Sequence, residues 1–167
     1  EGVAVAGGPA STKRPELPTE LAATYEANVK GLTKHPTASN LAGLLSETPG
    51  FGDVVDVPAE LRGTYAGAAL MAPYLKALGM TVIELLPVHE TNSSESGDPA
   101  MTNWWGYQTL AYFAPNRDYA HDRSPGGPTR AVKAMVQAVH DAVIEGHLDD
   151  VFNHTADGGN LGCQLHT

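Results

Sequence analysis

The sequence predicts an α/β protein built on a parallel sheet, and three observations support this fold class. Residues 81–88 form a nearly continuous apolar run, which is typical of a strand buried on both faces. Helical periodicity precedes this run at residues 66–78 and returns at residues 128–143, before a further predicted strand at 144–152. Crossover helices between parallel strands are right-handed, which leaves a doubly wound sheet or the opening of a (β/α)8 barrel.

The composition fits one globular domain and argues against two classes of partner. The chain has 167 residues, of which 42% are hydrophobic and 17% charged. Its 10 basic side chains stand against 19 acidic ones, a net charge of -9, so we expect no nucleic-acid partner. The sequence has no apolar run of about 18 residues, so we expect no membrane partner either. The single cysteine, Cys163, excludes an internal disulfide.

The first third of the chain carries the weakest pattern. Residues 1–21 are rich in Gly, Pro, Ser and Ala, which predicts a flexible linker or tail before a folded domain at 22–167. Residues 22–33 alternate loosely and favour a short strand with Tyr25, Ala27 and Val29 on one face. Prolines and glycines then predict an irregular excursion to residue 63, with one helical turn near residues 38–45.

The two later helices have clearer signals at their ends. The helix at 66–78 should end at Gly79, and Pro73 disturbs it unless the proline lies in the first turn. The second helix should start at Pro128 and bury one face, made of Val132, Met135, Val136, Val139 and Val143. Residues 89–103 are polar and predict a long loop at the carboxyl end of a strand, where α/β proteins carry their functional residues.

Several familiar sites do not fit the residues present. The sequence lacks the spaced glycines of nucleotide-binding loops, and His147 with His154 has no zinc-ligand spacing. An isolated cysteine such as Cys163 is more often inert than nucleophilic. The aromatic run at 104–107 suits sugar rings, whose C–H faces stack on aromatic faces, although packing in the core is the competing interpretation.

The last predicted strand carries acidic residues. Asp149 shares a strand face with Asn153, which favours a polar network at the ligand end of the sheet. Asp150 has the opposite parity and should face the helix layer, where an unpaired carboxylate is costly.

Five segments, in the same order along the chain, carry a resemblance to a known family. They are Tyr-Glu-Ala-Asn-Val-Lys-Gly-Leu-Thr at 25–33, Arg-Gly-Thr-Tyr-Ala-Gly at 62–67, Val-Ile-Glu-Leu-Leu-Pro-Val-His-Glu-Thr at 82–91, Asn-Trp-Trp-Gly-Tyr at 103–107 and Leu-Asp-Asp-Val-Phe-Asn-His-Thr at 148–155. The chain thus resembles the α-amylase superfamily of glycoside hydrolases, and within it the bacterial isoamylases, which cut α-1,6 links in glycogen and amylopectin. The resemblance implies a partial (β/α)8 barrel made of the first three βα units.

The resemblance also implies roles for individual residues. Tyr107 matches the tyrosine that stacks on the sugar at the cleavage subsite, and His154 matches the histidine that hydrogen-bonds the same sugar. Asp149 matches a position that organises the site from the third strand, and Trp105 completes the expected substrate-binding set. The implied partner is a branched α-glucan, either glycogen or amylopectin.

Calcium is the cofactor that the resemblance implies. Asn153 matches a calcium ligand of many α-amylases, and the calcium region of bacterial isoamylases implicates Glu90, Thr91 and Asn116. Oxygen ligands of these kinds suit calcium. Asn116 stands where the family usually has a carboxylate.

The family's catalytic residues are expected elsewhere. In the family, the aspartate nucleophile, the glutamate general acid and a third aspartate come from later strands than those predicted here. A retaining mechanism needs two carboxyl groups about 5–5.5 Å apart, and the neighbours Asp149 and Asp150 should point to opposite faces. We therefore expect a fragment of a retaining hydrolase that is inactive alone and has the remainder of the barrel as its partner.

Two alternatives stay open. The chain could be a non-catalytic α-glucan-binding module that keeps the aromatic residues as a sugar platform. It could also be a fragment of a pullulanase or a branching enzyme, which the loops after later strands would distinguish. The resemblance slightly favours an extracellular or periplasmic location.

Overall fold

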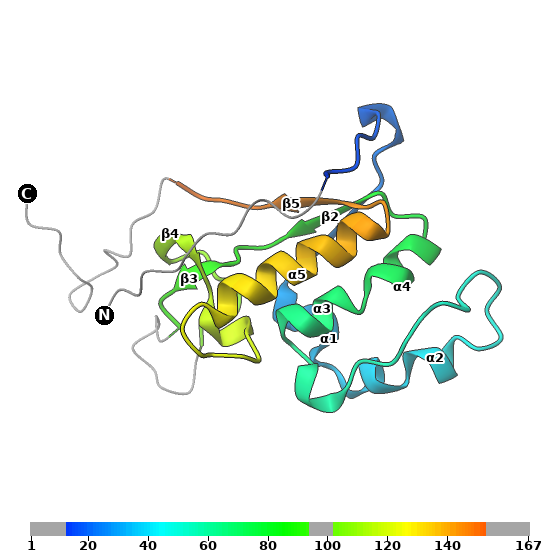
Figure 1. Ribbon diagram of the computed structural model, residues 1–167, viewed down its shortest axis with the longest axis horizontal. Coiled ribbons are helices and arrows are strands. Elements are labelled where there is room, and N and C mark those ends of the chain that lie inside the picture. Colours follow the sequence, from blue (N-terminus) through cyan, green and yellow to red (C-terminus); the bar gives the residue numbers. More distant parts are fainter. Residues whose placement is uncertain (1–12, 94–101, 153–167) are drawn as a thin grey trace, which may run out of the picture.

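The computed structural model describes residues 13–93 and 102–152 and has the α/β fold class that the sequence predicts. Three parallel strands, β1 (Thr24–Ala27), β2 (Val82–Leu85) and β5 (Glu145–Leu148), form one sheet in the order β1-β2-β5. Two further strands, β3 (His89–Thr91) and β4 (Thr109–Pro115), form an antiparallel pair. The helices lie on one side of the parallel sheet (Figure 1).

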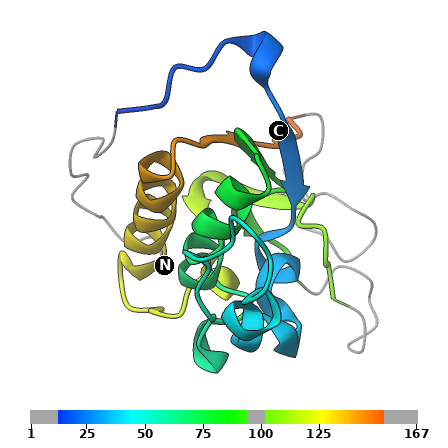
Figure 2. The same ribbon diagram turned by 90° about the vertical axis from the view of Figure 1, so that its right-hand side faces the viewer.

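The α-helices in the described ranges are short, apart from the last. They are α1 (Val29–Lys34), α2 (Leu41–Leu44), α3 (Tyr65–Ala69), α4 (Ala72–Ala77) and α5 (Gly127–Asp141). Short 3-10 turns occupy Thr19–Leu21, Pro36–Asn40, Ala59–Leu61 and Arg117–Tyr119. Figure 2 shows α5 beside α3, with which it makes extensive contact. None of these helices has the length and apolar character needed to cross a membrane.

The two faces of the parallel sheet differ in chemistry. Ile83 and Leu85 of β2 pack into the buried core with residues of α3 and α5. Side chains alternate along a strand, so Glu84 lies on the other face. The register places Glu84 level with Glu26 of β1 and His147 of β5. At the level of Glu84, the face away from the helices is therefore polar and largely acidic.

The first strand is shorter than predicted. It ends at Ala27, and Asn28 then caps α1 by accepting a hydrogen bond from the Gly31 amide at 3.0 Å. Val29, predicted to share a strand face with Tyr25 and Ala27, is the first residue of α1 and is fully buried. An asparagine that satisfies a free helix amide outweighs a loose alternating pattern.

The helix predicted at 66–78 is two helices. Thr64 caps α3, the chain turns at Leu70 and Met71, and α4 begins one residue before Pro73. Proline fits the first turn of a helix but not its interior, which explains the break. Gly79 ends the segment with a positive φ of 79°, as predicted. In the earlier excursion, the turn predicted near 38–45 is a 3-10 turn followed by α2.

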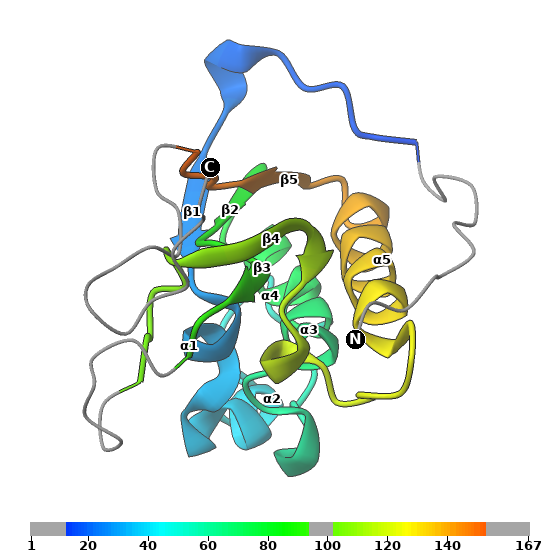
Figure 3. The ribbon, with the colours of Figure 1, turned by 90° about the vertical axis from the view of Figure 1, so that its left-hand side faces the viewer.

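The polar segment at 89–103 is not simply a loop, because its first three residues form β3. This strand pairs with β4, whose run of Leu, Tyr and Phe residues suits a strand that packs on one side. Figure 3 shows the pair, which we call the β3–β4 hairpin, side by side near the carboxyl ends of the parallel strands. The sequence analysis missed this pairing.

The second predicted helix is confirmed as α5, with Pro128 in its first turn. Met135 and Val139 are buried, as predicted, whereas Val143 lies beyond the helix with a φ of 62° and is 55% exposed. The strand predicted at 144–152 is reduced to β5. The tail predicted at 1–21 is described only from residue 13, so its flexibility and the domain limits 22–167 stay predictions.

Candidate functional site

Two of the predicted substrate-binding residues meet beyond the carboxyl end of the parallel sheet. Asp149 directly follows β5, and Tyr107 lies just before β4. The Tyr107 hydroxyl donates a hydrogen bond to Asp149 Oδ2 at 2.5 Å. The main-chain amide of Asp149 donates to the carbonyl of Leu85 at the end of β2, at 2.9 Å, which fixes the carboxylate over the sheet.

The surroundings of this pair keep the phenol protonated. The hydrogen bond to Asp149 raises the pKa of Tyr107 to about 12, with smaller contributions from burial and from the negative charges of Asp149, Glu26 and Glu84. A phenol with a raised pKa remains a hydrogen-bond donor at neutral pH. The pair is therefore a neutral donor held by a carboxylate, a combination that can orient sugar hydroxyls.

A glycine positions Tyr107. Gly106 has a φ of 85°, and its amide donates to Asn103 Oδ1 at 3.0 Å. A Cβ atom at Gly106 would lie only 3.0 Å from the carbonyl oxygen of Pro87. A larger residue is therefore disfavoured for two reasons, because its backbone would be strained and its Cβ atom would press against the Pro87 carbonyl.

The two tryptophans before this glycine are exposed. Trp105 is 60% exposed and Trp104 is 40% exposed, so packing in the core, the competing interpretation, does not describe them. Tyr119 does pack in the core, and Phe113 is fully exposed on β4. Tyr119 is thus a core residue, whereas Trp104, Trp105 and Phe113 lie on the surface. Exposed tryptophan rings next to hydrogen-bonding groups suit sugars.

Asp150, predicted to face the helix layer, where an unpaired carboxylate would be costly, has a partner. Its Oδ1 contacts His89 Nε2, at the start of β3, through a short hydrogen bond. Nearby, the Tyr112 hydroxyl donates to the Val151 carbonyl at 2.9 Å, and the Tyr112 ring stacks on Phe152 at 5.0 Å between centroids. These contacts tie the chain after β5 to the β3–β4 hairpin, which is why strand parity does not extend beyond Leu148.

Three of the expected calcium ligands lie together at the hairpin, with Glu90 and Thr91 on β3 and Asn116 directly after β4. Glu90 pairs with Arg117 Nε at 2.8 Å and accepts from the Arg117 amide at 3.0 Å. Asn116 Nδ2 donates to Thr91 Oγ1 at 3.4 Å, and Asn116 Oδ1 accepts from the Asp118 amide at 2.9 Å.

This arrangement does not fit a calcium site, because its only carboxylate is already neutralised and the oxygens of Glu90 and Asn116 accept protein hydrogen bonds. Residues 13–93 and 102–152 also contain no group of three His, Cys, Asp or Glu side chains that could hold a metal ion. Calcium stays a prediction of the resemblance, and we assign it no role in the function.

Some expectations fall outside the described residues, and some contacts were not expected. His154 and Asn153 lie in the part of the chain that the structure does not describe. The sequence analysis missed Asn28, which caps α1 and also donates to the Trp104 carbonyl at 3.1 Å. It also missed Glu26 and Glu84, although a charged residue inside an apolar strand was the available signal.

Curated proteins with similar sequences include isoamylases and glycogen debranching enzymes. An isoamylase from Flavobacterium sp. is 44% identical over 164 residues, which cover 95% of this chain and 19% of the isoamylase. A glycogen debranching enzyme from Yersinia enterocolitica is 40% identical over 157 residues, covering 92% of this chain and 21% of that enzyme. The chain therefore spans about a fifth of the length of these curated relatives. No family profile matches the chain.

Solved structures agree on the fold. A pullulanase from Anoxybacillus sp. LM18-11 superposes with a TM-score of 0.65 at 23% identity, over 87% of this chain and 20% of the pullulanase. The same pullulanase complexed with maltotriose gives a TM-score of 0.64 at 25% identity, over the same shares of the two chains. The identities and names together show that, over the length it spans, this chain belongs to the family of isoamylases and glycogen debranching enzymes.

Proposed function

We propose that this chain is part of a retaining enzyme that hydrolyses α-1,6 branch links in glycogen or amylopectin, and that it supplies residues that hold the sugar. In this proposal β1, β2 and β5 are the first three strands of a (β/α)8 barrel. The remainder of the barrel is the partner, and it carries the catalytic carboxylates. The names of the isoamylase and debranching homologues support this reaction, and the pullulanase neighbours support the barrel.

One observation carries the sugar-binding role, namely the Tyr107–Asp149 hydrogen bond at the carboxyl end of the sheet. Ligands of barrel enzymes bind at this end, because the loops after the strands converge there. In the proposal, the Tyr107 ring stacks on the C–H face of a glucose unit while Asp149 fixes the ring's orientation. Trp105 offers a second exposed ring two residues earlier.

Asp149 and Asp150 support a binding role more than a catalytic one. Asp149 is bonded to Tyr107, and Asp150 is paired with His89. Retaining hydrolysis needs one carboxylate free to attack the sugar and a second, protonated carboxyl group that donates its proton to the leaving-group oxygen. We therefore assign both of those roles to residues outside this chain.

The test measures binding of the chain to glycogen. Electrophoresis in gels that contain the polysaccharide gives the affinity, because binding slows the protein. Tyr107→Ala should weaken binding about three- to tenfold, since ring stacking contributes roughly 0.5–1.5 kcal/mol. Tyr107→Phe, which keeps the ring, is the matched control and should retain most of the binding. Equal binding by wild type and Tyr107→Ala would remove the role assigned to Tyr107.

The reaction itself is tested on the polypeptide that the source organism makes. Its mass should be several-fold above that of these 167 residues, and it should release linear chains from amylopectin. A non-catalytic glucan-binding module is the second candidate, favoured by the exposed Trp104 and Trp105 rings. Glycogen binding without release of reducing ends by that natural polypeptide would select this candidate.

A further inference from the structure

A pocket lies beside α1, and neither Tyr107 nor Asp149 lines it. Its volume is about 610 Å³, within the range of small-molecule sites. Five segments line it: α1, the stretch at 60–64 before α3, residues 91 and 93, the segment at 102–104, and the stretch at 116–123. Its charged lining residues are Lys30, Lys34, Arg62, Arg123, Glu60 and Asp118.

The charge of this pocket is opposite to that of the chain. Four cationic side chains face two carboxylates in a protein whose net charge is -9. Of the cations, only Arg123 has a carboxylate partner among the described residues, and its distance to Asp118 is a long 3.7 Å. Lys30, Lys34 and Arg62 have no carboxylate partner in that part of the chain. The protein therefore leaves an excess of positive charge around this space.

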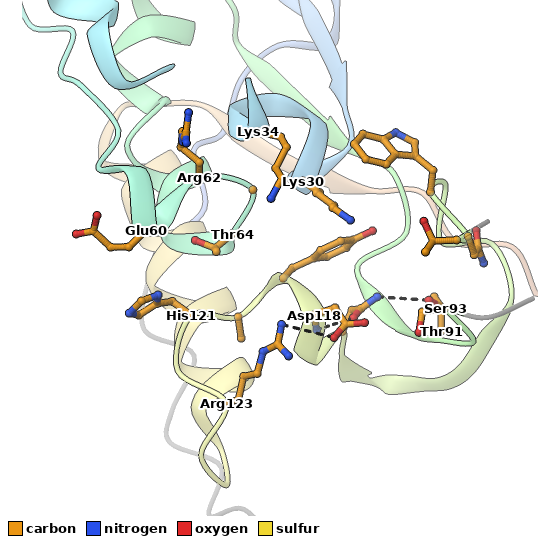
Figure 4. Close-up of a pocket in the computed structure, with 17 residues that line it drawn as sticks. Lys30, Lys34, Glu60, Arg62, Thr64, Thr91, Ser93, Asp118, His121 and Arg123 are labelled. Carbon is orange, nitrogen blue, oxygen red and sulfur yellow. Dashed lines mark hydrogen bonds and ion pairs between the residues drawn. The ribbon is translucent and has the colours of Figure 1, made fainter. Parts of the chain in front are cut away.

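The two lysines are held in place. They lie four residues apart and so share one face of α1, a spacing at which like charges destabilise a helix. Their stems pack on Gly63, where a Cβ atom would lie 3.1 Å from Lys34 Cδ and 3.4 Å from Lys30 Cγ. Lys30 Nζ also lies 5.2 Å from the ring centroid of Trp104. Figure 4 shows both lysines extending from α1 toward the side where Asp118 and Arg123 lie.

We propose that this pocket binds a phosphate monoester of a sugar. A phosphate monoester carries nearly two negative charges at neutral pH, which matches the excess of two positive charges in the lining. Lysine ammonium groups bind phosphate as point charges, and an arginine offers paired donors. The half-exposed Trp104 ring and the hydroxyl groups of Ser93 and Thr102 then suit the sugar.

A sugar phosphate monoester has two sources. It is either a free sugar phosphate or a phosphate ester carried on a glucan chain. The phosphate-binding proposal can be tested separately from the proposed hydrolysis, because phosphate binding is measured without a glucan. Failure of this proposal would leave the glycogen-binding test of Tyr107 unaffected, and the reverse also holds.

The experiment is isothermal titration of the chain with glucose 1-phosphate, inorganic phosphate and maltose at fixed low ionic strength. Glucose 1-phosphate should bind more tightly than inorganic phosphate, and maltose should not bind at this pocket. Lys34→Met keeps most of the stem and removes the charge, so it should weaken glucose 1-phosphate binding about tenfold. Lys76→Met, on the exposed surface of α4 and outside this pocket, is the matched control and should change binding less than twofold.

Each outcome decides something. Absence of saturable binding by both phosphates overturns the proposal, and so does equal weakening by Lys34→Met and Lys76→Met, which would mean a diffuse charge effect. Inorganic phosphate binding as tightly as glucose 1-phosphate would overturn the sugar part. Arg123→Gln, at an exposed side chain, gives a second variant, and circular dichroism confirms that each variant folds. Tighter binding of a phosphorylated dextrin than of glucose 1-phosphate would assign the ester to a glucan chain.

Discussion

Two regions beyond the carboxyl ends of the strands have opposite charges. Around Tyr107 the neighbours are Asp149, Glu26 and Glu84, whereas the pocket beside α1 is lined by an excess of cations. Glu26 and Lys30 are only four residues apart, yet they belong to different regions because the chain changes from strand to helix at Asn28. The net charge of the whole chain therefore says little about the charge of a particular region, because a change from strand to helix can send nearby residues to different regions.

The two regions are also physically joined. Asn28 Nδ2 donates to the Trp104 carbonyl at 3.1 Å and to the Tyr119 hydroxyl at 3.4 Å. Trp104 lines the basic pocket, and Tyr107, three residues later, forms the acidic pair. One short segment therefore serves both regions, so damage to its support should affect both.

The largest expected effect comes from Tyr65, which lies beneath the hairpin. It is fully buried, and its hydroxyl reaches the carbonyls of Val88 at 3.0 Å and Asn116 at 3.1 Å. Burial raises the pKa of this phenol, so it remains a donor at all ordinary pH values. Tyr65→Ala should lower the free energy of unfolding by about 3–5 kcal/mol, measured by urea denaturation.

Tyr65→Phe is the control, because it removes only the hydroxyl and should cost about 1–3 kcal/mol. Both regions should loosen together in Tyr65→Ala. A variant that lost glycogen binding but kept phosphate binding would break the link between the regions.

The next effect concerns Asn28, the residue that connects the two regions. Asn28→Ala removes the cap of α1 and the contact with Trp104, and it should cost about 2 kcal/mol in urea denaturation. Asn28→Ser keeps a capping oxygen and should recover about half of this loss. Tryptophan fluorescence should shift in Asn28→Ala because the support of Trp104 is lost. An unchanged unfolding curve in Asn28→Ala would show that the two regions do not depend on this residue.

A third prediction concerns the acidic region alone. Asp149→Asn should lower the pKa of Tyr107 from about 12 toward its ordinary value of 10, because the carboxylate is the main cause of the rise. The titration is isolated as the difference in phenolate absorbance between each protein and its Tyr107→Phe counterpart. A Tyr107 pKa that stays near 12 in Asp149→Asn would assign the rise to burial instead.

The same shift predicts a stability change with pH. A raised pKa means that the folded state favours the neutral phenol, so its contribution is complete below pH 10. It should be lost as the pH rises from 10 to about 12. Urea denaturation across this range should show a steeper loss of stability in wild type than in Tyr107→Phe.

The smallest expected effect is at Arg117, and it tests the calcium prediction. Arg117 is mostly exposed, so Arg117→Ala should cost only about 0.5 kcal/mol in the absence of calcium. The variant removes the cationic partner of Glu90 but keeps the main-chain amide that the carboxylate also accepts from. Calcium should therefore leave the melting temperature of wild type unchanged, and any rise should appear only in Arg117→Ala. Melting curves with calcium and with a chelator measure both effects. If calcium affects neither protein, the calcium prediction fails for Glu90, Thr91 and Asn116.

Parts of the fold could be read from local patterns, and parts could not. The apolar run that became β2 and the periodic face of α5 are local signals, and both were predicted at nearly the right residues. The β3–β4 hairpin was missed because its two strands are separated in sequence and its pairing depends on docking beside the sheet. The split of the helix at Leu70 was foreshadowed by Pro73, whose effect depended on where the first turn began.

The candidate site divides in the same way. Tyr107 and Asp149 were predicted individually through the resemblance, and the fold brings them into contact. The partner of Asp150 was not predictable, because His89 is 61 residues away along the chain. The cations at 30, 34, 62 and 123 were likewise too dispersed to suggest a site.

The sequence by itself determined the fold class, the positions of the strongest strand and helix, and the residue types that suit a sugar. These follow from periodicity and residue chemistry, which act over a few residues at a time. Only the tertiary structure decided which charges meet. Distant side chains become neighbours when helices pack on a sheet and turns such as Arg62–Thr64 approach α1, so an acidic chain can enclose a basic pocket.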